Sequence, residues 1–218
     1  MMMDTVIEGF ELLDSLGVNK EIQQLFSEVL REDDSGRLIA DYLDENRKVV
    51  DQEVHAVSKK KLSSCGILYF STVLPENVRI LYISDAVMPL IFMVQSKIKR
   101  VDFAYSAFMA TGARMEKESV LHGIDRYPKG IKIYTVFGHS LMGRIRDCKV
   151  QHWIKGMDCL FNVEGETVVA IFKGKKYRMP VGEFSLRKHL KQAGTRQTLF
   201  TYKPMDKNID NFYRFNYF

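Results

Sequence analysis

The sequence predicts an α/β fold, in which a mostly parallel, Rossmann-like sheet follows a helical and hairpin subdomain and precedes a β-rich basic extension. Two apolar segments, Val78–Ser84 and Ile131–Phe137, have the composition of buried strands. Each runs into a turn and then a helical pattern, Ala86–Lys97 after the first and a basic segment beyond Gly143 after the second. A third strand, Val101–Ser106, is predicted between them. Because ligands of such folds bind where parallel strands end, the two strand ends form the first candidate site.

Two helices are predicted within residues 4–30. Apolar residues recur at three- and four-residue steps from Val6 to Leu16, and Gly17 is placed to end the first helix. Asn19 can cap the second, which carries an apolar stripe over Ile22–Leu30. We expect this stripe to pack on its own domain; a partner-binding face is the alternative.

A hairpin and an edge segment are predicted before the first core strand. Arg37–Leu43 and Lys48–Val57 flank a polar turn at residues 44–46. Residues 59–61, three lysines, are interpreted as a solvated loop, with a phosphate contact as the alternative. Gly66–Ser71 is either a short edge strand or a buried connector.

The remaining elements are predicted from alternation and turn residues. Met115–Leu121 is a short helix inside the core. Cys159–Val163 and Thr167–Phe172 form a second hairpin, which continues into a strand at Lys173–Met179. Phe184–Gln192 is a short basic helix. We therefore expect an N-terminal subdomain at 1–74, an α/β core at 75–155 and a basic β-rich extension with an aromatic tail at 156–218.

Charge is divided unevenly along the 218 residues, whose net charge is +5. Residues 1–58 carry 5 basic and 14 acidic side chains, and residues 59–218 carry 27 basic and 13 acidic ones. This asymmetry indicates a body that faces a polyanion, with an acidic N-terminal portion. An uneven solvated surface is the alternative.

Nothing in the sequence has the spacing of a common metal or cofactor site. The cysteines are Cys65, Cys148 and Cys159. They are odd in number, share no metal-type spacing and are interpreted as reduced thiols of a cytoplasmic protein. His55, His122, His152 and His189 form no H-x-x-x-H pair, and no Gly-rich phosphate loop is present. We therefore predict no metal and no cofactor.

The sequence contains no run of ~18 apolar residues that would indicate a membrane helix, and the acidic N-terminus lacks the basic region of a signal peptide.

The two strand ends resemble the motifs of the Toprim domain of bacterial-type DNA primases and topoisomerases. The segment ILYISDAVMPL is similar to the first motif, with Ser84 standing where that family has Glu. The segment FGHSLMGR is similar to the Asp-x-Asp-x-x-Gly motif, with Gly138 and Ser140 in place of the two Asp residues and Gly143 retained. The resemblance thus implies a Toprim scaffold that is degenerate at its metal-binding positions.

The resemblance extends over roughly residues 10–150. The helical pair and the hairpin before the core are similar to the segment that precedes the Toprim domain in primase catalytic cores. This implies a relation to the primase-like proteins of mobile elements and a part in DNA replication or mobilisation.

The missing carboxylates decide the expected chemistry. Toprim enzymes use the Glu as a general acid or base, or as a ligand, and the Asp pair to hold Mg²⁺, which prefers carboxylates and substrate phosphates. Ser84, Gly138 and Ser140 supply no charge, so we predict no catalytic residue, with Asp85 and His139 as remnants. His139 is either an acid–base group or phosphate contact, or an incidental turn residue.

Binding to nucleic acid, with DNA favoured, is the expected function. The basic residues predicted to contact it are Arg144, Arg146, Lys149, Lys173, Lys175, Lys176, Arg178, Arg187 and Lys188. A phosphate is expected at the helix start near Ser140–Gly143. Lys191 and Arg196 extend the set, and the interleaved aromatics Tyr177, Phe184, Phe200 and Tyr202 offer base stacking. The alternative is a solvated basic face over an aromatic core.

Three functional hypotheses follow. The first is a non-catalytic Toprim-like protein that binds nucleic acid or a replication or mobilisation partner, with no membrane association. The second is a phosphoryl-transfer enzyme with a rearranged site of Asp85, His139 and Asp102. The third is a protein-interaction module that uses the acidic N-terminal helices or the aromatic tail. For the aromatic residues among 212–218 we expect docking into their own domain, because so much aromatic surface is poorly accommodated in water.

Overall fold

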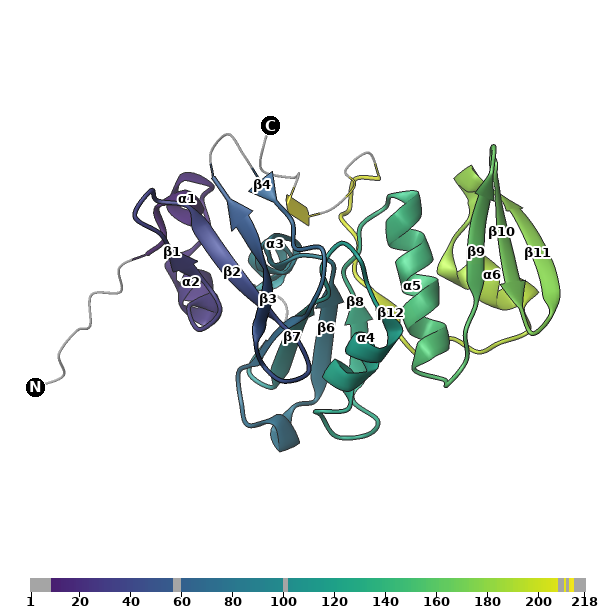
Figure 1. Cartoon of the computed structure of the whole chain (residues 1–218), viewed down its shortest axis with the longest axis horizontal. Coiled ribbons are helices and arrows are strands. Elements are labelled where there is room, and N and C mark those ends of the chain that lie inside the picture. The colour runs from purple at the N-terminus through teal and green to yellow at the C-terminus, as the bar shows by residue number, and fades with distance from the viewer. Residues whose placement is uncertain (1–8, 57–59, 100–101, 208–209, 211, 214–218) are drawn as a thin grey trace, which may run out of the picture.

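The computed structural model describes residues 9–56, 60–99, 102–207, 210 and 212–213. Within them the strands form three sheets, ordered β1-β2-β3-β4, β12-β8-β6-β7-β5 and β11-β10-β9. Figure 1 shows the second of these in the centre of the molecule, with the other two on opposite sides. The fold is therefore mixed α/β, as the sequence predicts.

The central sheet is organised around β6 (Ile80–Ser84). It pairs in parallel with β7 (Ser106–Ala110) and with β8 (Lys132–Thr135), so that Ser84 lies opposite Ala110 and Ile83 opposite Thr135. The antiparallel strand β5 (Leu68–Ser71) and the short parallel strand β12 (Phe200–Thr201) form the edges. The strand ends near residues 84 and 137 are thus neighbours in one sheet, as expected.

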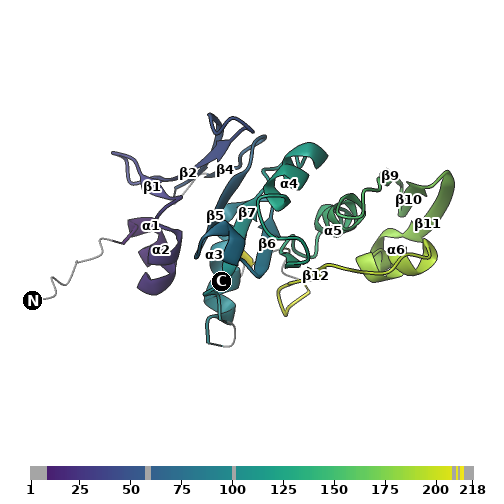
Figure 2. The same cartoon turned by 90° about the horizontal axis from the view of Figure 1, so that it is seen from below.

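Both faces of the central sheet are covered, which explains why its strands are almost continuously apolar. Tyr82 and Phe108 face one core together with α3 (Val87–Lys97). Leu81 and Met109 face the other. Figures 1 and 2 show α3 on one side of the sheet and the helices α4 and α5 on the other. Because residues Val87 to Val94 of α3 are all buried, this helix lies inside the protein and has no solvent face along that length.

The N-terminal elements cover the outer side of α3. They are α1 (Glu11–Ser15), α2 (Lys20–Phe26), β1 (Arg31–Glu32), β2 (Leu38–Leu43), β3 (Val49–His55) and β4 (Lys60–Lys61). Ile22 and Phe26 of α2 are fully buried in the same core as Phe108. The apolar stripe of α2 therefore packs on its own domain. Lys61 pairs with Asp51, while Val6 and Lys59 lie outside the described residues.

The second face carries α4 (Lys117–Ile124) and α5 (Leu141–Trp153). Beyond α5 lie β9 (Leu160–Glu164), β10 (Thr167–Phe172), β11 (Lys175–Pro180) and α6 (Leu186–Gln192). Two 3₁₀ turns, η1 (Pro75–Asn77) and η2 (Val181–Glu183), precede β6 and α6. The three antiparallel strands and α6 pack together at the end of the molecule furthest from the N-terminal sheet (Figure 1).

Two expectations about strands are wrong. Among the described residues, the strand predicted at Val101–Ser106 begins only at Ser106, because Asp102 accepts a hydrogen bond from the Ala104 N–H and turns the chain there. Lys60 and Lys61, interpreted as part of a solvated loop, form β4 against β3. The sequence analysis also missed β1 and β12, which have two residues each and are defined by their pairing with β2 and β8. After β12 the tail returns to α3, where Phe212 and Tyr213 are buried. Both therefore dock onto their own chain, as expected, although against α3 of the core and not within the extension; the tail aromatics after them lie outside the described residues.

No helix among the described residues combines the length and the apolar character needed to cross a bilayer.

We expect Phe108→Ala to lower the free energy of unfolding by about 3–5 kcal/mol, because it empties the centre of an aromatic cluster. The Phe108 ring lies 5.0 Å from that of Phe70 and 5.3 Å from that of Phe26. Denaturant unfolding measures the change. Met205→Ala, at a residue that is 88% exposed, is the control and should change it little. Equal effects of the two substitutions would contradict this account of the core.

Candidate functional site

The β6 and β8 ends meet at a cluster of short polar groups. Ser84 is fully buried, and its hydroxyl lies 3.3 Å from Asp85 Oδ1 and 3.4 Å from the Val136 carbonyl oxygen. Ser140 is the N-cap of α5, where its hydroxyl accepts a hydrogen bond from the Gly143 N–H at 3.1 Å. The Ser84 hydroxyl thus bonds within the strand-end cluster, and the Ser140 hydroxyl caps α5.

Gly143 is required by the close approach of α5 to the end of β8. A Cβ at this position would lie 2.9 Å from the Gly138 carbonyl oxygen and would also overlap the Phe137 carbonyl. Gly138 itself has φ of 58°, a conformation that favours glycine. The Gly-x-x-x-x-Gly spacing of the turn therefore has a packing reason, independent of any ligand.

The Asp85 carboxylate is paired with a cation of the same chain. Its Oδ2 accepts a hydrogen bond from Arg146 Nη1 at 2.5 Å, and Arg146 Nη2 donates to the Ala113 carbonyl at 2.8 Å. The side chains are only 22% and 14% exposed, respectively. Arg146, which was predicted to face nucleic acid, thus reaches across from α5 to the end of β6.

A second carboxylate, Asp147, lies at the end of β8. It is 1% exposed and accepts hydrogen bonds from Thr135 Oγ1 at 2.6 Å and from Lys203 Nζ at 2.7 Å. Lys203 also donates to the Gly138 carbonyl at 2.5 Å. Burial raises the pKa of the Asp147 carboxyl, and the Lys203 ammonium opposes that shift. Each carboxylate of the strand-end site therefore has an internal cation beside it.

The tail beyond β12 contacts the turn through His139. The imidazole Nε2–H donates to the Pro204 carbonyl at 2.8 Å, and the His139 backbone N–H donates to Asp210 O at 2.6 Å. Asp102 lies elsewhere, because it precedes the amino end of β7 whereas Asp85 follows the carboxyl end of the parallel strand β6. A site that joins Asp85, His139 and Asp102 is therefore contradicted by the strand geometry.

Glu53 of β3 places a third carboxylate close by, at the start of α3. It is fully buried and accepts hydrogen bonds from the Val87 N–H at 2.9 Å, Tyr42 Oη at 2.6 Å and His55 Nε2 at 2.6 Å. Ala86, at the N-cap, makes no side-chain cap. Glu53 thus takes the place of a local cap, and its charge lies at the positive end of the helix dipole.

Two of the predicted nucleic-acid contacts are used inside the protein. Arg144 Nη1 donates to the Val181 and Phe184 carbonyls at 3.0 and 2.8 Å, which ties α5 to the segment before α6. Arg146 is paired with Asp85 as described. Lys149 is half-buried, with Nζ 5.9 Å from the Trp153 ring centre. Phe184 is 1% exposed, so it offers no stacking surface for a base.

The other predicted basic residues lie on the surface of the C-terminal elements. They are Lys173, Lys175, Lys176, Arg178, Arg187 and Lys188, all exposed. Arg178 pairs with Glu164, and Lys188 pairs with Glu183. No ion pair is formed by Lys175, Lys176 or Arg187 with any described residue.

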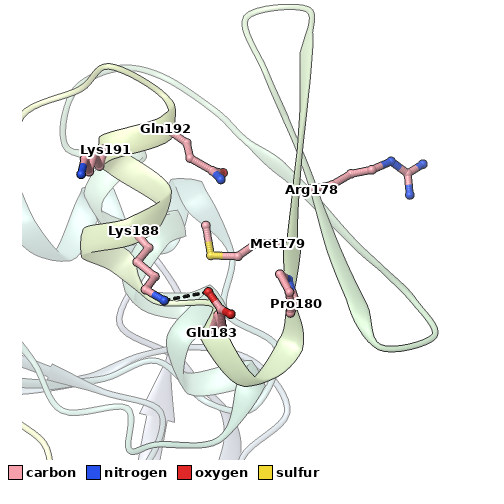
Figure 3. Close-up of a pocket in the computed structure, with 7 residues that line it drawn as sticks. All are labelled: Arg178, Met179, Pro180, Glu183, Lys188, Lys191 and Gln192. Carbon is pink, nitrogen blue, oxygen red and sulfur yellow. Dashed lines mark hydrogen bonds and ion pairs between the residues drawn. The ribbon is translucent and has the colours of Figure 1, made fainter.

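A hollow of about 430 Å³ lies between β11 and α6. Figure 3 shows Lys188, Lys191 and Gln192 along α6, with Met179 and Pro180 of β11 facing them and Arg178 directed away at the edge. Its lining includes the cations Arg178, Lys188 and Lys191 and the carboxylate of Glu183. Arg178 pairs with Glu164 and Lys188 pairs with Glu183, so much of this charge is already matched by the chain's own carboxylates.

The sequence analysis missed Glu53, Asp147 and Lys203. Glu53 had no clear signal, because Asp85 beside Ala86 is a residue type that commonly caps helices, and only the structure shows it paired with Arg146 instead. Asp147 and Lys203 gave no local signal, since 56 residues separate them and only the fold makes them partners.

No family model matches the sequence, and no curated protein matches it. Among solved structures, the chain is similar to a primase domain in a complex of bacteriophage T7. In that complex the lagging-strand DNA polymerase interacts with primase domains of two gp4 subunits bound to an RNA/DNA hybrid and dTTP. The identity is 16%, the similarity covers 61% of this chain and 68% of that one, and the TM-score is 0.38. The Toprim assignment stays a prediction, and the proposals below rest on this chain's own residues.

We expect the pair Asp85 and Arg146 to show a coupling energy of about 0.5–3 kcal/mol in a double-mutant cycle of Asp85→Ala and Arg146→Ala. Either single change leaves a partly buried charge without its partner, which the double change removes. Urea unfolding gives the four stabilities. The exposed pair Arg178 and Glu164 is the control and should couple by less than about 1 kcal/mol. Additive effects at Asp85 and Arg146 would show that the pair is energetically unimportant.

Glu53→Gln should lower the free energy of unfolding by about 1–3 kcal/mol, because the amide keeps the shape but loses the charge that three buried donors share. The control is Glu28→Gln, which changes the same group on the surface at the end of α2. Thermal and denaturant unfolding compare the two variants. If Glu53→Gln is as stable as Glu28→Gln, the carboxylate does not anchor α3.

Proposed function

We propose that this protein is a non-catalytic, primase-related nucleic-acid-binding protein. Its binding surface is formed by the exposed cations of β11 and α6, and its strand-end site carries out no metal-dependent phosphoryl transfer. DNA is the favoured ligand. The single observation that carries the proposal is the division of basic residues into two sets, one paired internally at the strand ends and one exposed on the C-terminal elements.

The strand ends support the non-catalytic part of the proposal. Mg²⁺ sites use several oxygen ligands, usually carboxylates together with substrate phosphates. Asp85 and Asp147 are each in contact with a cation of the chain, Arg146 and Lys203 respectively. A magnesium ion at either carboxylate would have to displace a partly buried cation and leave it unpaired, which is costly. Internal pairing therefore competes directly with metal binding.

The C-terminal surface supports the binding part. Lys176 and Arg178 are two residues apart on β11, so their side chains extend from the same face of the sheet, while Lys175 extends from the other. On α6, Lys188 and Lys191 border the hollow. Lys175, Lys176, Arg187 and Lys191 have no ion-pair partner among the described residues, so their charge is available to phosphates.

A part in DNA replication or mobilisation, alongside a replication or mobilisation protein, belongs to the same proposal. It rests on the motif resemblance at ILYISDAVMPL and FGHSLMGR. The RNA/DNA hybrid and the polymerase are partners in the T7 complex, and this part of the proposal does not rest on them.

Single-stranded DNA binding, followed by fluorescence anisotropy over a range of salt concentrations, tests the proposal. We expect affinity to fall steeply with salt, because phosphate contacts release counterions. Lys175→Glu with Lys176→Glu should weaken binding and lower the slope by about 0.7, the value for one phosphate contact on a single strand, because the two side chains extend from opposite faces of the sheet.

The matched control is Lys129→Glu with Lys132→Glu, which makes the same charge change at two exposed lysines at the start of β8. Equal loss in both double variants would mean that net charge alone governs binding and would refute the placement of the surface. Absence of salt-dependent binding would favour the protein-interaction module. Tight Mg²⁺ or Mn²⁺ binding abolished by Asp85→Ala would favour the phosphoryl-transfer enzyme and contradict the non-catalytic assignment.

A further inference from the structure

Three buried metal-ligating side chains converge beyond the end of α5. His152 comes from α5, Cys159 precedes β9, and His189 comes from α6. The two Nε2 atoms are 2.8 Å apart, and Cys159 Sγ is 3.9 Å from His189 Nε2. All three ligand atoms lie within 4.8 Å of one another, and each residue is at most 2% exposed.

The hydrogen bonding of this cluster does not satisfy its own polar atoms. A neutral imidazole carries one N–H, so in a His–His contact one Nε2 must donate and the other accept. His152 Nδ1 is buried without a hydrogen-bond partner among the described residues. Whichever ring donates, His152 therefore keeps one buried nitrogen unpaired. Its Nε2 lies against His189 Nε2.

Apolar groups enclose the cluster. The Phe172 ring centre is 4.5 Å from that of His152, and the Phe161 ring centre is 5.3 Å from that of His189. For both Nε2 atoms to bind a metal, the ring that donates in the His–His contact must carry its proton on Nδ1 instead. The Cys159 thiol must likewise lose its proton, because the thiolate is the form that binds a metal.

We propose that His152, Cys159 and His189 form a binding site for a transition-metal ion, with Zn²⁺ as the preferred occupant. Imidazole nitrogen and thiolate sulfur are the ligands that zinc favours over oxygen-preferring Mg²⁺. With bonds of about 2.0–2.1 Å to nitrogen and about 2.3 Å to sulfur, tetrahedral ligand atoms lie roughly 3.3–3.6 Å apart. The two distances from His189 Nε2, 2.8 Å to His152 Nε2 and 3.9 Å to Cys159 Sγ, need shifts of less than an ångström to match this geometry, and all three ligand atoms lie within 4.8 Å of one another.

Three protein ligands leave one coordination position for water or another small ligand. Cys148 lies on α5 four residues before His152 and is buried, so it borders the site from the same helix face. Bound metal would join α5, β9 and α6 covalently. It would thereby fix the helix that carries Lys188 and Lys191 to the central domain.

The site is tested by titrating Zn²⁺ and Co²⁺ into the full chain after removal of metal with a chelator. We expect one ion per chain, release of a proton, a higher Tm with zinc, and a near-ultraviolet thiolate-to-cobalt charge-transfer band. Cys159→Ser should abolish the band. His189→Gln should weaken zinc binding by more than about 100-fold, since loss of an outer-shell partner alone costs 10–100-fold. The controls are Cys65→Ser and His122→Gln, which change the same residue types away from the cluster and should bind as the unaltered protein does.

Two outcomes would overturn the proposal: a cobalt complex without the thiolate band, or zinc binding that is unchanged in both Cys159→Ser and His189→Gln. Circular dichroism first establishes that each variant is folded. Should His189→Gln fail to fold, the cobalt charge-transfer band of the unaltered protein and its loss in Cys159→Ser still decide the question, because the band requires a metal-bound thiolate. DNA affinity is measured separately, so loss of the metal site and loss of the proposed binding function are distinguishable.

Discussion

The pairing of two buried or half-buried carboxylates with two cations of the same chain is the constraint on which the centre of this structure depends. Asp85 at the end of β6 pairs with Arg146, and Asp147 beside the end of β8 pairs with Lys203. Since Arg146 and Asp147 are adjacent on α5, one placement of this helix sets both pairs. Lys203 arrives from the tail only after β12 has joined the sheet beside β8. Both ion pairs of the strand-end site therefore form only when α5, the central sheet and the tail are all in place.

The same pairing explains the distribution of positive charge. A carboxylate in a low-dielectric environment is stable only with a partner, and Arg146 and Lys203 provide it inside the fold. The lysines of β11 and α6 have no buried acid to neutralise, so they stay at the surface. The basic character that the sequence shows over residues 59–218 thus has two physical origins, which composition alone does not separate.

The general fold was predictable because strands buried on both faces are almost continuously apolar and are bounded by turns, as in Val78–Ser84 and Ile131–Phe137. The contacts of the strand-end site were much less predictable from the sequence, because they join residues far apart in the chain. Arg146 and Asp85 are 61 residues apart, and Glu53 reaches the Val87 N–H across 34. The cluster of His152, Cys159 and His189 follows no metal-binding spacing, since folding rather than sequence brings it together. Arg144 and Arg146 were assigned to a ligand for the same reason: a basic helix gives no indication of which arginines face inward.

Helix α5 links these features because its sides face different parts of the molecule. Arg144, Cys148 and His152 follow one another at four-residue steps, so they lie along one side, where Arg144 and His152 contact the segment before α6 and α6 itself. Arg146 and Asp147 reach the strand ends instead. Internal cation pairing and the exposed basic surface thus belong to separate parts of the structure joined by one helix. A change in the surface lysines should therefore leave the strand-end pairs intact, because none of those lysines contributes a hydrogen bond to them.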